Sequence, residues 1–104
     1  LFRSIVAVTS CATGIAHTYM AAEAIERAGK AAGHEMFVET QGAGGYKPIS
    51  REIILAADVV IFANDVGIRD LDRFEGCKIV QSIPKTAIKD PKSLILQAEE
   101  LAGK

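Results

Sequence analysis

Residues 9–18 read TSCATGIAHT, and this short stretch decides the fold of the chain. The preceding residues 4–8, SIVAV, are apolar and rich in β-branched side chains, which predicts a buried strand. The following residues 16–32 have the pattern of a helix. A strand that passes through a tight turn of small residues into a helix brings unpaired backbone N–H groups together, and the helix dipole adds positive potential. The stretch therefore predicts a cradle for an anion.

Cys11 stands at the entrance of this cradle. N–H groups around a sulfur stabilise the thiolate, which is the nucleophilic form of cysteine. We therefore interpret Cys11 as a nucleophile that carries a phosphoryl group. The alternative is a small buried apolar residue, which is a common role of free cysteine. Cys77 opens a predicted strand with no helix start behind it, and we expect it to have that packing role.

Phosphoryl transfer needs hydrogen-bond donors at fixed positions, because the charge of the transition state spreads over the equatorial oxygens. The N–H groups from Thr13 to Thr18 are expected to supply them, and Gly14 permits backbone angles that other residues resist. His17 is expected to orient the cradle or to bond the phosphoryl oxygens, with capping or packing as the alternative. The residues expected to bind the phosphoryl group are Ser10, Ala12, Thr13, Gly14, Ile15, Ala16, His17 and Thr18.

The rest of the chain continues the alternation of strands and helices. Residues 59–63, VVIFA, form an apolar run without alternation, which is typical of a strand buried on both faces of a parallel sheet. Ser50 is a candidate N-cap for a short helix, and Asp90 followed by Pro91 is a strong helix start. The other predicted elements are strands at 35–40 and 78–82, a short helix at 51–57, a polar loop at 64–74 and a last helix from Pro91.

This order of elements predicts an α/β fold. Strands that alternate with helices favour a four-stranded, parallel, doubly wound sheet, flanked by helices in three layers, with right-handed crossovers. Ligands of such sheets bind beyond the carboxyl ends of the strands, where the strand order reverses. If the first strand is central, Cys11 falls at that point.

The composition narrows the classes of function. The 104 residues suit one domain, and the net charge of −1 offers no basic face for nucleic acid or for lipid. No apolar run is long enough to span a bilayer, so no membrane insertion is expected. The two cysteines lie in different contexts, which argues against a disulfide framework or a structural zinc site and fits a reducing cytosol. No acidic cluster is placed to hold Mg²⁺, so we expect neither a metal nor a cofactor.

Residues 11–24, CATGIAHTYMAAEA, resemble the signature of a known family. It is the IIB domain of the bacterial phosphoenolpyruvate-dependent sugar phosphotransferase system, fructose-specific class. The similarity continues through residues 38–42 (VETQG), 56–61 (AADVVI) and 73–76 (RFEG), so it covers most of the chain. Ala12 departs from the family, which usually has proline there, and so do the segments 42–48 and 65–72. The resemblance implies a four-stranded parallel sheet flanked by helices.

The resemblance also implies a function and two partners. In that family, the cysteine matching Cys11 takes a phosphoryl group from a phosphohistidine on the IIA domain. It then passes the group to a sugar, usually fructose, bound in the membrane IIC domain. We therefore expect residues 1–104 to be a single IIB domain. Because Leu1 is not Met, we also consider that the domain was excised from a longer IIBC or IIABC chain. Such a domain would be cytoplasmic, at the inner face of the cell membrane through IIC.

Two alternatives remain open from the residues. The first is a low-molecular-weight cysteine phosphatase or an arsenate-reductase-like enzyme, which needs an arginine six residues after the cysteine, where this chain has His17. It also needs an acid for the leaving group, for which Asp65, Asp70 and Asp72 are available, although solvated loop charges are the simpler interpretation. The second is a regulatory module that binds phosphate without a covalent bond, but GxxxxGK[ST] and GxGxxG are both absent. A glycine run at 42–45 could form an anion nest, with a surface loop as the simpler interpretation.

Three further residues carry weaker expectations. Phe74 and Tyr46 are candidates for a docking patch, although each fits better as an anchor within its own loop. His34 follows a predicted helix end and is expected to lie on the surface with no role.

Overall fold

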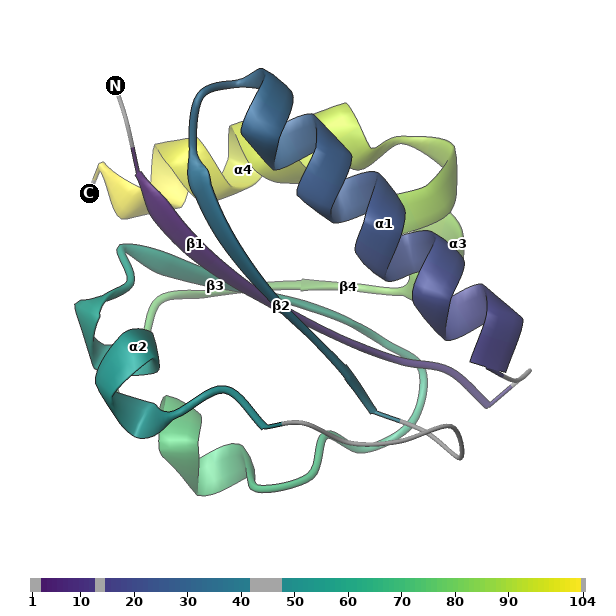
Figure 1. Cartoon of the computed structure of the whole chain (residues 1–104), viewed down its shortest axis with the longest axis horizontal. Helices are drawn as coiled ribbons and strands as arrows, with labels where there is room; N and C mark the ends of the chain where they lie inside the picture. The colour runs from purple at the N-terminus through teal and green to yellow at the C-terminus, as the bar shows by residue number, and fades with distance from the viewer. Residues whose placement is uncertain (1–2, 13–14, 42–47, 104) are drawn as a thin grey trace.

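The computed structural model describes residues 3–12, 15–41 and 48–103. Strands and helices follow one another in the order β1, α1, β2, α2, β3, η1, β4, α3 and α4 (Figure 1). Their bounds are β1 Ser4–Ser10, α1 Ile15–Ala31, β2 Glu35–Gln41, α2 Arg51–Ala56, β3 Val59–Asn64, the 3₁₀ helix η1 Leu71–Phe74, β4 Ile79–Ser82, α3 Pro84–Lys89 and α4 Pro91–Ala102.

The four strands form one all-parallel sheet in the order β2-β1-β3-β4, which confirms the predicted α/β class. β1 is central, and its last residue, Ser10, pairs with Gln41 of β2 on one side and with Asn64 of β3 on the other. Helices α1, α3 and α4 cover one face of the sheet, while α2 and η1 lie on the other face (Figure 1). The strand order reverses between β1 and β3, so residue 11 follows the strand that lies at this switch point.

Alternation along β1 divides the core between the two faces. Ile5 and Ala7 belong to the cluster beneath α1, α3 and α4, whereas Val6 and Val8 belong to the cluster beneath α2 and η1. The five apolar residues at the start of β3 are all buried, as expected for a strand covered on both faces.

Local signals set the beginnings of α2 and α4. The Ser50 side chain accepts a hydrogen bond from the N–H of Ile53, and the Asp90 side chain accepts one from Ser93, so both predicted caps are confirmed. Several boundaries differ from prediction by one or two residues; for example, β1 and β2 continue to Ser10 and Gln41. The 3₁₀ helix η1 forms within the predicted 64–74 loop. Helix α3 was not predicted, since it has only six residues and no side-chain cap, and Pro84 at its start was the only signal.

Two aromatic side chains join η1 to the sheet. The rings of Phe62 and Phe74 meet edge to face, with centroids 4.9 Å apart and an interplanar angle of 88°. Phe74 is 2% exposed, so the prediction that it belongs to a docking patch is wrong, and the prediction of an anchor is confirmed. Tyr46 lies outside the described residues. Cys77 is half-buried and packs against the same cluster, which confirms its packing role.

His34 is buried, and the prediction of a surface position is wrong. Its side chain is 1% exposed, Nδ1 accepts the backbone N–H of Arg3 at 3.0 Å, and Nε2 lies 2.5 Å from Glu99 Oε2. Since Nδ1 accepts, Nε2 carries the proton that is donated to Glu99. The reason lies in the fold, which brings the beginning of β1 and the last turns of α4 together around this residue.

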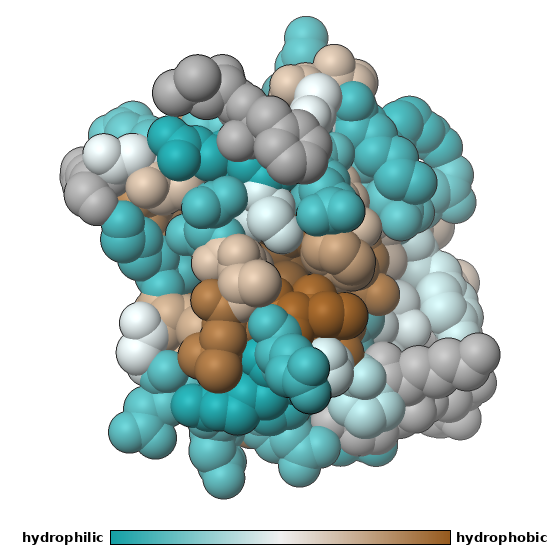
Figure 2. Space-filling view, turned by 60° about the vertical axis from the view of Figure 1, so that its left-hand side comes forward, coloured by the Kyte–Doolittle hydropathy of each residue, from teal (hydrophilic) through white to brown (hydrophobic). Residues whose placement is uncertain are grey.

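Apolar side chains gather in a hollow at the amino ends of the strands, on the side of the molecule that Figure 2 shows. Ile54, Leu55, Val60 and Cys77 are among the residues that line it. The hollow lies at the opposite end of the sheet from Cys11, so it contributes nothing to the site described next.

Candidate functional site

Cys11 follows β1 at the carboxyl edge of the sheet and is half-buried. Helix α1 begins four residues later at Ile15, so the N–H groups of its first turn have no acceptor within the helix. The strand, turn and helix predicted from residues 9–18 therefore place the sulfur beside the positive end of a 17-residue helix.

Within the described part of the chain, the side chains of Asp65 and His17 both contact the sulfur. Asp65 Oδ2 accepts a hydrogen bond from the thiol at 3.3 Å, and His17 Nδ1 lies 3.5 Å from Sγ. In the tautomer that carries its proton on Nδ1, His17 donates to the sulfur while the sulfur donates its own proton to Asp65. A chain of donors thus runs from the imidazole through the thiol to the carboxylate.

Asp65 also reaches the backbone next to the cysteine. Its Oδ1 accepts the N–H of Ala12 at 2.8 Å, and its own N–H donates to the carbonyl of Ser10 at 3.1 Å. Asp65 is exposed, as expected of a solvated loop charge, but its carboxylate also reaches from the end of β3 across to the end of β1. Asp70 and Asp72 belong to the neighbourhood of η1, as its N-cap and within its first turn.

Of the eight residues predicted to bind the phosphoryl group, the structure describes the backbone of six. Ser10 and Thr18 are buried, and the Thr18 carbonyl accepts a hydrogen bond from the Thr9 hydroxyl at 3.1 Å. Ala12 is exposed, with its N–H held by Asp65. Ile15, Ala16, His17 and Thr18 form the first turn of α1, whereas Thr13 and Gly14 lie outside the described residues.

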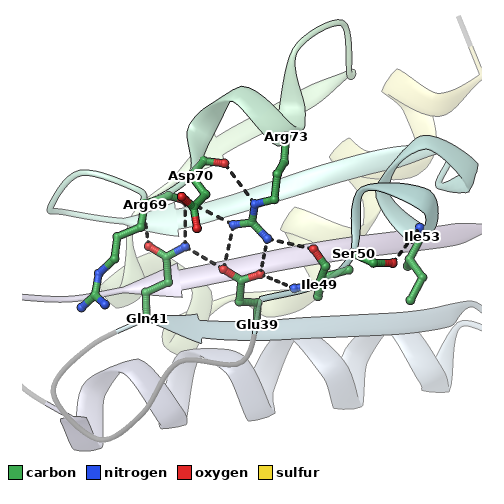
Figure 3. Close-up of polar contacts among 8 residues, drawn as sticks. All are labelled: Glu39, Gln41, Ile49, Ser50, Ile53, Arg69, Asp70 and Arg73. Carbon is green, nitrogen blue, oxygen red and sulfur yellow. Dashed lines mark hydrogen bonds and ion pairs between the residues drawn. The ribbon is translucent and has the colours of Figure 1, made fainter.

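A second polar cluster, which we call the Glu39 cluster, lies at the carboxyl end of β2 (Figure 3), where Gln41 pairs with Ser10 of β1. Its members are Glu39, Gln41, Ile49 and Arg73. The Arg73 guanidinium grips the carboxylate of Glu39 with two bonds, Nη1 to Oε1 at 2.8 Å and Nη2 to Oε2 at 3.0 Å. The Gln41 amide and the N–H of Ile49 donate to the same carboxylate, each at 2.7 Å.

These contacts decide the ionisation of Glu39, whose side chain is 0% exposed. Burial raises the pKa of the Glu39 carboxyl, but hydrogen bonds from Arg73, Gln41 and Ile49, together with the charge of Arg73, outweigh it and hold the pKa below its ordinary value. Glu39 is therefore an ionised group within a nearly complete set of donors. This pairing was not predicted, although a glutamate within a strand otherwise flanked by core residues was a signal that a cation had to be near.

The Glu39 cluster fixes the chain segment that carries Asp65. Gln41 Oε1 accepts the N–H of Arg69 at 2.7 Å, and Arg73 also donates to the carbonyls of Ile49 and Asp70, at 2.9 and 3.0 Å. The guanidinium carbon lies 4.9 Å from the centroid of the Phe74 ring. These bonds tie the later part of the segment between β3 and β4, residues 69–73, to β2 and to the residues that follow it.

Among the described residues, no group of three or more His, Cys, Asp and Glu side chains is arranged to hold a metal ion. Within the same part of the chain, no helix has the length and apolar character needed to cross a membrane.

Comparisons with known proteins point to one family. The family model for "PTS system, Lactose/Cellobiose specific IIB subunit" matches residues 6–97. The "PTS system fructose-like EIIB component 2" of Escherichia coli K12 is 45% identical over 96 residues, which are 91% of each chain. The "PTS system fructose-specific EIIB'BC component" of Xanthomonas campestris pv. campestris is 50% identical over 102 residues, which are 97% of this chain but 17% of that protein. A crystal structure of a predicted fructose-specific IIB from Escherichia coli is similar with a TM-score of 0.91 and 33% identity, covering 98% of this chain and 91% of that one.

Proposed function

Because this chain belongs to the IIB family of the phosphoenolpyruvate-dependent sugar phosphotransferase system (PTS), we propose that Cys11 is the residue that carries its phosphoryl group. The chain is a IIB phosphotransferase component of the fructose-type class. Membership of this family decides against a phosphatase and against a regulatory module that never forms a covalent bond.

The chemistry proposed for Cys11 has two transfers. In the first, the sulfur attacks the phosphorus of a phosphohistidine on a IIA domain, so that an S–P bond forms as the P–N bond breaks. In the second, a sugar hydroxyl attacks the same phosphorus and the S–P bond breaks. The observation that supports this role is the position of Cys11, half-buried at the switch point of the sheet and four residues before α1 begins.

The groups around the sulfur would serve the transfers by position and charge. We assign to the N–H groups of the first turn of α1 the binding of the phosphoryl oxygens, as the positive end of a helix favours an anion. His17 lies 3.5 Å from the sulfur, close enough for its Nδ1–H to turn from the sulfur to a phosphoryl oxygen once the S–P bond has formed. Ser10, Ala12, Thr13, Gly14 and Thr18 complete the proposed phosphate-binding set.

The partners of this chain follow from its family. We propose that a IIA domain is the phosphohistidine donor and that a membrane IIC domain presents the sugar, with fructose as the substrate named in the relatives. The chain would then act in the cytoplasm at the inner face of the membrane, where IIC opens to it. Neither nucleic acid nor a cofactor has a part in this proposal.

An intact-mass measurement tests the role of Cys11. The protein is incubated with a phosphorylated IIA domain and then weighed, alongside Cys11→Ala and the matched control Cys77→Ala. We expect a gain of one acid-labile phosphoryl group in the wild type and in Cys77→Ala, and no gain in Cys11→Ala. Phosphorylation of Cys11→Ala, or its loss in Cys77→Ala alone, would contradict the proposal.

A further inference from the structure

The Asp65 carboxylate contacts both the sulfur of Cys11 and the backbone N–H next to it. One oxygen of its carboxylate accepts a hydrogen bond from the thiol at 3.3 Å, and the other accepts one from the N–H of Ala12 at 2.8 Å. A single anionic group therefore spans the nucleophilic sulfur and the first backbone donor after it. A phosphoryl group bonded to the sulfur also carries its oxygens within reach of that donor, and it is more negative than the carboxylate.

The position of Asp65 is fixed from several sides. Its N–H continues the pairing of β3 with β1 by donating to Ser10, and the preceding Asn64 donates to the carbonyl of Val66 at 2.7 Å. Gln81 of β4 donates to the Asn64 side chain, also at 2.7 Å. Asp65 therefore stands beside the sulfur because the sheet places it there, although its side chain is open to solvent.

We propose that Asp65 is a positioning residue that acts through Cys11, as a built-in anion that holds the unphosphorylated site and makes the phosphorylated site less stable. This inference rests on the proposed function of Cys11. In the unphosphorylated protein, the carboxylate orients the thiol and keeps the backbone at Ala12 in place. In the phosphorylated protein, the same carboxylate repels the phosphoryl oxygens and competes with them for the N–H of Ala12.

The transfer itself leaves Asp65 unchanged. The S–P bond forms as the P–N bond of the donor breaks, and the thiol proton ends on the departing imidazole nitrogen. Asp65 therefore takes up no proton in the step. The carboxylate and the new phosphoryl group are then like charges in close proximity, which is unfavourable even in a medium as polar as water. The phosphocysteine is accordingly ready to give its phosphoryl group to the next acceptor.

The equilibrium between donor and acceptor measures this effect. Wild type, Asp65→Asn and the control Asp72→Asn are each equilibrated with a phosphorylated IIA domain, and the fraction phosphorylated on each protein is read by intact mass. Asparagine keeps an oxygen for the N–H of Ala12 but removes the charge, whereas Asp72 is an exposed carboxylate within η1. We expect Asp65→Asn to raise the equilibrium constant for phosphorylation of Cys11 about tenfold, equivalent to about 1.4 kcal/mol, and Asp72→Asn to leave it unchanged.

A fall in the equilibrium constant for phosphorylation of Cys11 in Asp65→Asn would refute the inference. A purely structural role for Asp65 would make its loss disturb the loop at Ala12 and lower the equilibrium constant. If the equilibrium constant in Asp65→Asn rises by less than about threefold, or falls, the inference is refuted. This threshold is well below the rise of about tenfold expected from about 1.4 kcal/mol. Failure of the wild type to become phosphorylated would instead refute the proposed function, so the two failures are distinguishable.

A second measurement needs no partner protein. Inorganic phosphate is titrated into the unphosphorylated chain while the backbone amide of Ala12 is followed by NMR. Asp65→Asn should bind phosphate more tightly than the wild type, with the amide of Ala12 among the signals that shift, because the competing charge is gone. Equal or weaker binding by Asp65→Asn would count against a built-in anion at this site.

Discussion

Removal of the Arg73 guanidinium is expected to destabilise the whole domain. In Arg73→Met, the carboxylate of Glu39 keeps its position in the core, with 0% of its side chain exposed, but loses its cation and two of its hydrogen bonds. Loss of one partner of a buried ion pair costs about 3–5 kcal/mol, because the other charge stays buried without compensation. The free energy of unfolding of a native domain is about 5–15 kcal/mol, so we expect Arg73→Met to lose a large part of it.

The free energy of unfolding is measured by guanidinium denaturation, followed by circular dichroism. The matched control is Arg27→Met, which makes the same substitution in the ion pair of Arg27 with Glu23 on α1, where the side chains are 74% and 69% exposed. Such a pair contributes about 0.2–0.5 kcal/mol. The double variant Glu39→Gln with Arg73→Met should recover part of the loss, since it removes the stranded charge. A cost for Arg73→Met no larger than that of Arg27→Met would refute the reasoning.

Three further predictions concern the same molecule. Because the folded-state pKa of Glu39 is lowered, its contribution to stability is present above the ordinary glutamate pKa of 4.5 and is lost as the pH falls through the folded value. The free energy of unfolding should therefore fall more steeply in acid for the wild type than for Glu39→Gln. Equal slopes for the two proteins would contradict this prediction. His34→Ala leaves Glu99 and the backbone N–H of Arg3 without their partner, so it should lower the free energy of unfolding by about 1–3 kcal/mol in the same denaturation assay. A change near zero would show that these contacts do not stabilise the domain. His17→Ala should slow the phosphorylation of Cys11 by on the order of 10²-fold in a quenched-flow time course with phosphorylated IIA, whereas an unchanged rate would remove His17 from the site.

Local signals in the sequence were sufficient to predict the fold. The strand, turn and helix around Cys11 follow from apolar runs, small residues and the start of a helical pattern, all within about twenty residues. The caps at Ser50 and Asp90 depend on contacts three residues away, so they too were predicted correctly. Short α3 was missed, since one proline is a weak signal for a single helix of six residues.

Such local signals could not predict the contacts between residues far apart in the sequence. Asp65 and Cys11 are separated by 54 residues and meet only because β3 lies beside β1 in the sheet, an order that periodicity does not specify. The bond between Glu39 and Arg73 joins residues 34 apart, through a 3₁₀ helix that was predicted as loop. His34 was misplaced for the same reason, because its partner comes from the far end of the chain.

The most direct test of the central claim is sugar phosphorylation by a reconstituted system of phosphorylated IIA, this chain and a IIC domain, with and without Cys11. The account predicts that Cys11→Ala abolishes the formation of sugar phosphate, while Cys77→Ala supports it at the rate of the wild type. Formation of sugar phosphate at an undiminished rate by Cys11→Ala would contradict it.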